Sequence, residues 1–126
     1  MRAASKRILV VEDDGPTCVT MQETLAASGF LVDTAADAER ALEKIHQNRY
    51  DVAILDLMLP DSDGVLLRQK ILSSTPGRSM RVIFTTGFTD QPTVLEYLRR
   101  SGNAFVAKPF RPAELIDAVH SVLAND

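Results

Sequence analysis

DVAILDLMLPDSDG, residues 51–64, is the stretch that decides the fold of this chain. It opens with an almost unbroken apolar run, which is typical of a strand covered on both faces in a parallel sheet. Asp56 stands at the end of this run, and Pro60 and Gly64 mark the loop that follows. The stretch therefore predicts a buried middle strand that ends in a carboxylate.

Other short apolar runs alternate with segments of helical periodicity, which is the pattern of an α/β fold. Together with 51–57, the predicted strands are 7–11, 30–35, 81–86 and 103–107. One helix is predicted because Cys18, Met21 and Leu25 share a face at helical spacing, and a second because Ala38, Ala41, Leu42 and Ile45 do. Three more helices are predicted over about 64–73, Asp90–Ser101 and Pro112–Leu123. Five strand and helix units therefore fill the chain.

The composition of the 126 residues is that of a globular protein, with 45% apolar and 25% charged residues. The net charge of -3 gives no sign of a surface for nucleic acid or an anionic membrane, and a basic partner surface fits it better. Cys18 has no second cysteine with which to form a disulfide, and no apolar run is long enough to span a membrane. Since no signal peptide is evident, we expect a cytoplasmic protein with one domain over 1–126, a core over about 6–124, and no effector domain in this chain.

A second stretch, ILVVEDDGPT at residues 8–17, runs an apolar strand directly into Glu12, Asp13 and Asp14. Carboxylates this close repel one another and lose hydration near the interior, so the cluster is costly unless a cation lies between them. In parallel sheets, ligands bind beyond the carboxyl ends of the strands, where the strand order reverses. We therefore expect the chemistry of this protein at the strand ends.

The residues at the other strand ends suit phosphoryl chemistry. Asp56 ends the third predicted strand, Thr86 ends the fourth, and Lys108 follows the fifth. Grouped carboxylates bind a hard divalent cation, and Mg2+ accepts a few oxygens while keeping several waters. Asp56 can then act as a nucleophile toward phosphorus, with Lys108 and a threonine hydroxyl binding the phosphoryl oxygens. The set is sufficient to form an acyl phosphate on aspartate.

Four motifs, ILVVED, ILDLMLPDSDG, VIFTTG and AFVAKPF, resemble in order and spacing the receiver domain of bacterial two-component response regulators. The resemblance covers essentially the whole chain. It implies a flavodoxin-like sheet of five parallel strands in the order 2-1-3-4-5, doubly wound by five helices. It also implies phosphotransfer to Asp56 from a sensor histidine kinase or a histidine phosphotransfer protein, in a signalling protein and not a turnover enzyme.

The resemblance assigns the metal site. Asp13 would ligate Mg2+, or Mn2+ in its place, directly, together with Asp56, and Glu12 would act mainly through a coordinated water. The third protein ligand would be the backbone carbonyl of Met58. Gly64 matches the turn into the third helix, where we expect it to use the freedom of glycine to adopt a positive φ.

The resemblance also assigns a switch. Thr86, directly before Gly87, would bind the phosphoryl group through its hydroxyl, and Phe105 would move inward when Thr86 is drawn toward the phosphate. The Lys108-Pro109 bond is expected to be cis, as it usually is in the family.

The output surface implied by the resemblance lies on the fourth helix, fifth strand and fifth helix. It would bind a downstream protein target or a second copy of the chain, without direct contact to nucleic acid and without membrane insertion. Candidate contacts on the fourth helix are Val94, Leu95, Tyr97 and Leu98, of which about half are expected to pack on the sheet. The sequence leaves open whether the chain acts alone or belongs to a larger regulator or hybrid kinase.

Three alternative functions fit these residues less well. A phosphatase of the haloacid dehalogenase type needs a second Asp two residues after the first, where this chain has Met58. A flavodoxin-like FMN carrier needs a cradle rich in Ser, Thr and Gly after the first strand, where this chain has the acidic EDDGP. A degenerate receiver that docks partners independently of phosphorylation typically lacks the acidic pair, the acceptor or the lysine, and all of these are present here.

Overall fold

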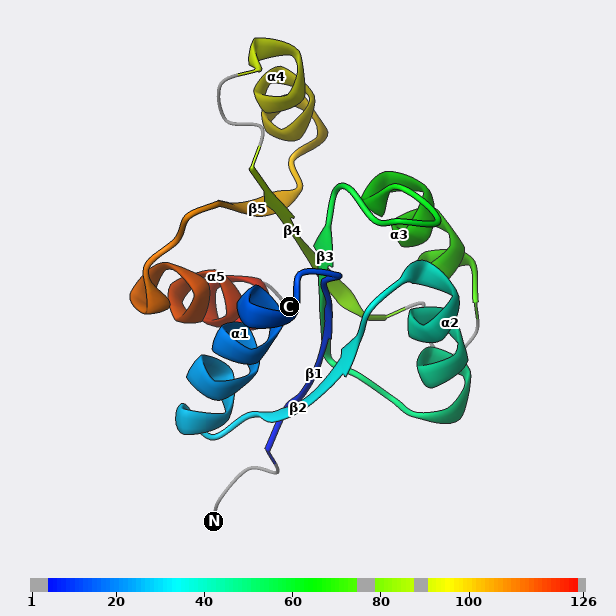
Figure 1. Ribbon diagram of the computed structural model, residues 1–126, viewed down its shortest axis with the longest axis vertical. Coiled ribbons are helices and arrows are strands. Elements are labelled where there is room, and N and C mark those ends of the chain that lie inside the picture. Colours follow the sequence, from blue (N-terminus) through cyan, green and yellow to red (C-terminus); the bar gives the residue numbers. More distant parts are fainter. Residues whose placement is uncertain (1–4, 75–78, 88–90, 125–126) are drawn as a thin grey trace.

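The computed structural model describes residues 5–74, 79–87 and 91–124. Within these residues, five parallel strands form one sheet that is surrounded by five helices (Figure 1). The strands are β1 (Arg7–Val11), β2 (Leu31–Ala35), β3 (Val52–Asp56), β4 (Arg81–Thr86) and β5 (Ala104–Ala107). The helices are α1 (Gly15–Ala27), α2 (Ala38–Gln47), α3 (Gly64–Ser73), α4 (Pro92–Ser101) and α5 (Pro112–Ala124). The strand order β2-β1-β3-β4-β5 confirms the predicted flavodoxin-like α/β fold.

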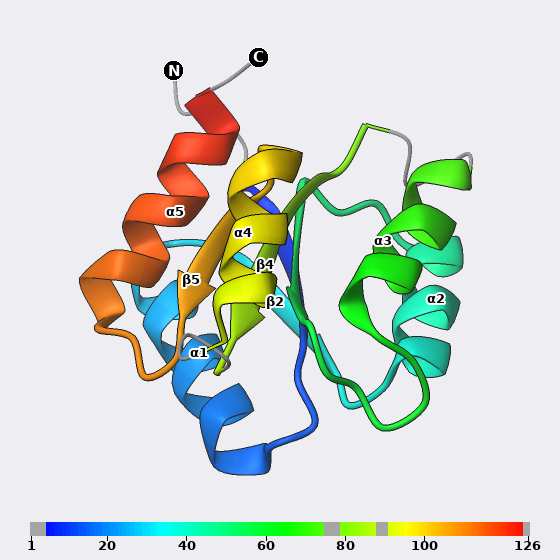
Figure 2. The same ribbon diagram turned by 90° about the horizontal axis from the view of Figure 1, so that it is seen from above.

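Different helices cover the two faces of the sheet. Side chains alternate between the faces along a strand, so Ile54 and Leu55 of β3 belong to different core clusters. The cluster of Ile54 includes buried residues of α1 and α5, whereas that of Leu55 includes residues of α2, α3 and α4. Figure 1 shows α1 and α5 on one side and α2 and α3 on the other, and Figure 2 shows α4 between α5 and α3. Because both faces are covered, β3 is buried along its whole length, as its apolar run predicts.

Aspartate side chains cap the N-termini of three helices. Asp14 caps α1 by accepting a hydrogen bond from the backbone N–H of Thr17 at 3.1 Å. Asp37 and Asp63 do the same for α2 and α3. Aspartate is among the best residues at this position, because its carboxylate satisfies N–H groups that the helix leaves free. The third acid of the EDD cluster therefore has a structural role, since it starts the helix that leads away from the strand end.

The predicted elements agree closely with the observed ones. α3 has the predicted bounds, and Met21 and Leu25 are buried on the inner face of α1 beside the half-buried Cys18. Asp90, the predicted start of the fourth helix, lies outside the described residues, within which α4 begins at Pro92. In the described part of the chain, no helix is long and apolar enough to cross a membrane.

One prediction about a glycine is wrong. Gly64 does not have a positive φ; among the described residues, Gly29 and Gly102 do. Gly64 is needed for a different reason, because a Cβ atom there would lie 2.7 Å from the backbone oxygen of Asp56. Its own N–H donates to the Leu57 carbonyl at 2.9 Å. The missing side chain lets the start of α3 lie against the end of β3, where the phosphoacceptor is predicted.

Candidate functional site

The predicted site residues come together at the carboxyl edge of the sheet. Glu12 and Asp13 directly follow β1, Asp56 is the last residue of β3, and Lys108 directly follows β5. β1 has β2 on one side and β3 on the other, so the strand order reverses at this point. Parallel strands end at the same edge, and the reversal leaves a crevice there for ligands.

Three carboxylates form an acid cluster, consisting of Glu12, Asp13 and Asp56. One oxygen from each lies within 4.8 Å of the others. Glu12 is 2% exposed and Asp56 is 7% exposed, whereas Asp13 faces solvent. A donor set made only of oxygen atoms suits a hard divalent cation such as Mg2+ and lacks the nitrogen and sulfur ligands that zinc favours. The acid cluster therefore fits the predicted metal.

Lys108 places its ammonium group between two acids of the cluster. Its Nζ donates to Glu12 Oε1 at 2.5 Å and to Asp56 Oδ2 at 2.9 Å. Burial by itself lowers the pKa of Lys108, but the hydrogen bonds to Glu12 and Asp56, together with their charges, outweigh burial and raise this pKa. The peptide bond between Lys108 and Pro109 is cis, as expected. The ammonium group thus supplies positive charge beside the carboxylate of Asp56.

Glu12 uses both of its carboxylate oxygens within the protein. Oε1 accepts from Lys108, and Oε2 accepts from the backbone N–H of Asp14 at 3.1 Å. Burial raises the pKa of Glu12, and these two hydrogen bonds offset the effect only in part. The contact with Lys108 was not predicted from the sequence, because the two residues are 96 positions apart. The one available signal was the length of the Glu side chain at a position where many members of the family have Asp.

The loop after β3 holds Met58 close to Asp56. The backbone N–H of Met58 donates to Asp56 Oδ1 at 3.0 Å, and the N–H of Leu59 donates to the Ser62 carbonyl at 3.0 Å. The side chain of Met58 is 58% exposed. This loop therefore carries the backbone that the resemblance assigns to the metal, with an apolar side chain turned toward solvent.

Thr86 and Phe105 lie on the same face of the sheet. Thr86 pairs with Ala107 and Phe84 pairs with Phe105, so alternation places all four on one face. Thr86 is fully buried, its carbonyl accepts from the N–H of Lys108 at 2.7 Å, and Phe105 is half-buried against the core cluster to which α4 contributes. Thr85 is also buried, and because it is adjacent to Thr86 in β4, alternation puts its side chain on the opposite face. This is the arrangement expected if Thr86 and Phe105 act as a pair.

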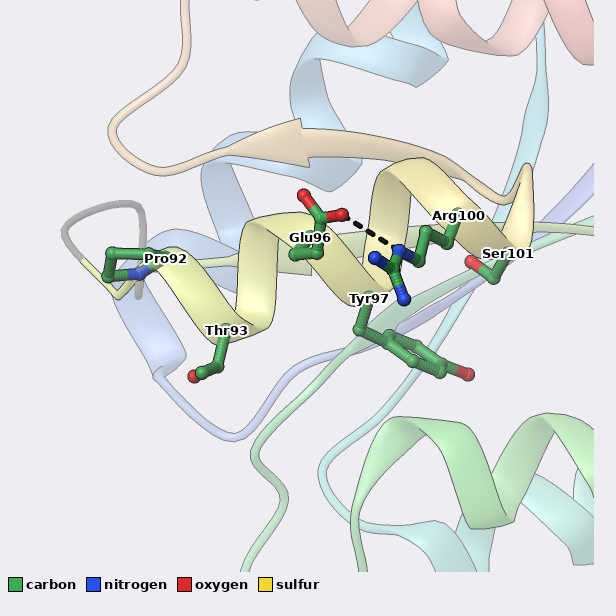
Figure 3. A pocket seen from close by; sticks show the side chains of 6 residues that line it. All are labelled: Pro92, Thr93, Glu96, Tyr97, Arg100 and Ser101. Atoms are coloured by element: carbon green, nitrogen blue, oxygen red, sulfur yellow. Dashed lines mark hydrogen bonds and ion pairs between the residues drawn. The ribbon is translucent and has the colours of Figure 1, made fainter.

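The predicted output contacts on α4 separate into two groups. Leu98 is fully buried and Val94 packs against the core, whereas Tyr97 is 41% exposed and Leu95 is half-buried. Figure 3 shows the outer face of α4, where an ion pair joins Glu96 and Arg100 at 2.8 Å. A groove of about 740 Å³ runs along this face, lined by Pro92, Thr93, Glu96, Tyr97, Arg100 and Ser101.

Comparison with known proteins gives a consistent result. The family model described as response regulator receiver domain matches residues 8–120. The transcriptional activator protein IrlR of Burkholderia pseudomallei is 36% identical over 119 residues, which are 93% of this chain and 50% of that protein. The chain thus spans about half the length of most of the curated relatives that it matches.

Solved structures agree with the family model. A putative response regulator from Chloroflexus aurantiacus superposes with a TM-score of 0.87 at 28% identity, over 97% of this chain and all of that one. The receiver domain of the sensor histidine kinase PA1611 from Pseudomonas aeruginosa, solved with a magnesium ion coordinated in its active site cleft, has a TM-score of 0.85 at 29% identity and covers the same shares. With its parallel sheet and its acid cluster beside a lysine, this chain belongs to the receiver domain family of two-component response regulators.

Proposed function

We propose that this chain is a phosphoacceptor in a two-component phosphorelay, and that Asp56 receives a phosphoryl group from a phosphohistidine donor. A carboxylate oxygen of Asp56 attacks phosphorus, and the bond between phosphorus and the donor nitrogen breaks, leaving its electron pair on the imidazole. The donor is a sensor histidine kinase or a histidine phosphotransfer protein. The observation that carries the proposal is the position of Asp56, which lies within the acid cluster and accepts a hydrogen bond from Lys108.

The residues around Asp56 have distinct roles in this proposal. Asp13, Asp56 and the Met58 carbonyl would hold Mg2+ (or Mn2+), with Glu12 acting through a coordinated water. Bound there, the ion supplies positive charge to the phosphoryl oxygens during transfer. Lys108 and the Thr86 hydroxyl bind the same oxygens and orient them.

Phosphorylation then shifts a population between two states of the domain. Thr86 moves toward the phosphoryl group and Phe105 follows it on the same face of the sheet. The surface formed by α4, β5 and α5 changes as a result, and binds a protein target or a second copy of the chain. The side chain of Tyr97 and the groove of α4 support this assignment, because they offer apolar surface and charge to a partner (Figure 3).

Intact mass spectrometry after incubation with acetyl phosphate tests the acceptor. We expect the wild type to gain one phosphoryl group in the presence of Mg2+ and none in its absence. Asp56→Asn should gain none while keeping the wild-type circular dichroism spectrum. Asp117→Asn, which changes an exposed acid on α5, is the matched control and should label like the wild type. A folded wild type that gains no mass with Mg2+ would contradict the proposal and favour a receiver that only docks partners.

A further inference from the structure

The loop between β3 and α3 holds the start of a different helix, α2. Asp61 lies in this loop, and its two carboxylate oxygens accept hydrogen bonds from the backbone N–H groups of Ala38 at 2.9 Å and Glu39 at 3.1 Å. These are the first two residues of α2. A carboxylate bonded to the first turn of a helix makes charge-assisted hydrogen bonds and is also favoured by the helix dipole. Asp61 therefore ties the loop to α2.

The start of α2 already has a cap of its own. Asp37 accepts from the N–H of Arg40 through its side chain at 2.8 Å and from the N–H of Ala41 through its backbone carbonyl at 3.1 Å. One capping side chain at the preceding residue is the usual arrangement. With Asp61 added, the N–H groups of the first three residues of α2, which have no carbonyl partner within the helix, are all bonded. The second carboxylate comes from outside the helix and connects two elements that are separate in the sequence.

The same loop carries a predicted metal ligand. Leu59 and Pro60 separate Asp61 from Met58, whose backbone carbonyl is assigned to Mg2+. The loop is largely exposed, since Met58, Pro60 and Asp61 all face solvent. Leu57 and Leu59, on either side of Met58, are buried in the core, so the part of the loop that depends on hydrogen bonds is the exposed turn from Pro60 to Ser62. Met58 and Leu59 also have hydrogen bonds within the loop and to Asp56, so loss of the two bonds from Asp61 to α2 would shift the turn after Leu59 and, through it, change the orientation of the Met58 carbonyl without releasing the loop.

We propose that Asp61 is a positioning residue for the metal site. Its carboxylate holds the loop between β3 and α3 on the first turn of α2, and so keeps the Met58 carbonyl directed toward the acid cluster. Asp61 acts through the backbone and does not bind the metal. The inference rests on the proposed function, because it takes the Met58 carbonyl as a Mg2+ ligand. Coupling between two sites is reciprocal, so Mg2+ binding should also strengthen the contact of Asp61 with α2.

The test compares Asp61→Ala with Asp37→Ala. Each variant removes a carboxylate that caps α2, but only Asp61 lies in the loop that carries Met58. Mg2+ is titrated while amide chemical shifts are followed by NMR, at a temperature where thermal unfolding shows that all the proteins are folded. Loss of an outer-shell partner weakens metal binding by roughly 10–100-fold, and we expect about tenfold for Asp61→Ala, at the lower end, because Asp61 acts through the loop. Asp37→Ala should bind Mg2+ like the wild type, and Asp61→Asn, which keeps one acceptor oxygen, should lie between.

Amide hydrogen exchange provides a second readout that helix stability alone would not change. Mg2+ should slow exchange at the N–H groups of Ala38 and Glu39 in the wild type and have no such effect in Asp61→Ala. The positioning role would be overturned if Asp61→Ala bound Mg2+ as tightly as the wild type does. It would also be overturned if Asp61→Ala and Asp37→Ala lost Mg2+ affinity equally, and in both cases the metal site itself would remain supported. A wild type that binds no Mg2+ would instead overturn the proposed metal site, and the positioning role with it.

Discussion

At the scale of single residues, Lys108 neutralises two buried acids. Its ammonium group bonds to Glu12 and Asp56, so Lys108→Met would leave two like charges facing each other without a cation. We expect the free energy of unfolding in Mg2+-free buffer to fall by about 1–3 kcal/mol, which is the cost of leaving buried groups unsatisfied. Urea denaturation monitored by circular dichroism measures this change.

Addition of Mg2+ checks the cause of the stability loss in Lys108→Met, because the ion and the ammonium group would neutralise the same carboxylates. Saturating Mg2+ should therefore recover more stability in Lys108→Met than in the wild type. Lys6→Met, which removes an exposed lysine before β1, should change neither stability nor the response to Mg2+. If Lys108→Met unfolds at the same urea concentration as the wild type, the acid cluster does not depend on this cation.

At the scale of elements, the junction of β3 with α3 depends on a residue without a side chain. In Gly64→Ala the new Cβ atom would meet the backbone of Asp56, so the start of α3 must move. Overpacking of this kind costs about 1–3 kcal/mol, and we expect that loss of stability in urea denaturation. Gly15→Ala, at the first residue of α1, is the matched control, since a Cβ atom added there would have nothing within 4 Å. Equal stability of the two variants would show that the close approach at Gly64 imposes no constraint.

The contact between Asp61 and α2 predicts a pH dependence at the same scale. The hydrogen bond from the Ala38 N–H, with that from Glu39, lowers the pKa of Asp61 below its ordinary value of 3.8. A carboxylate whose pKa is lowered by folding contributes stability that is fully present above the unfolded value and is lost as the pH falls through the folded value. The difference in Tm between the wild type and Asp61→Asn should therefore narrow between about pH 5 and pH 2. A difference that stays constant over this range would contradict the role of the charged carboxylate in holding α2.

At the scale of the whole molecule, Mg2+ should stabilise the fold, because the acid cluster is assembled only when β1 and β3 pair. A ligand at 100 times its Kd stabilises the native state by about 2.7 kcal/mol. We expect Tm in a thermal scan to rise with the logarithm of the Mg2+ concentration once the site is nearly saturated. Asp13→Asn, which removes one carboxylate of the cluster, should show a much smaller rise, and equal rises in both proteins would place the bound Mg2+ elsewhere.

The sequence by itself determined the elements and the candidate site. Apolar periodicity predicts where strands and helices lie, because burial on one or both faces imposes its own spacing on the chain. The four motifs then predict which strand ends carry Glu12, Asp13, Asp56, Thr86 and Lys108, since each residue stands at the end of an apolar run or within two residues after it. Parallel pairing brings these strand ends to one edge of the sheet, and the observed strand order confirms that arrangement.

The tertiary structure alone decided how distant residues contact one another. Glu12 and Lys108 are 96 positions apart, and Asp61 is 23 positions from Ala38, so no local pattern encodes either contact. The same reason explains the error at Gly64, whose constraint comes from the approach of another backbone segment and not from its own φ. Local preferences arise within a few residues, whereas side-chain partners depend on how the elements pack, and packing exists only in the folded chain.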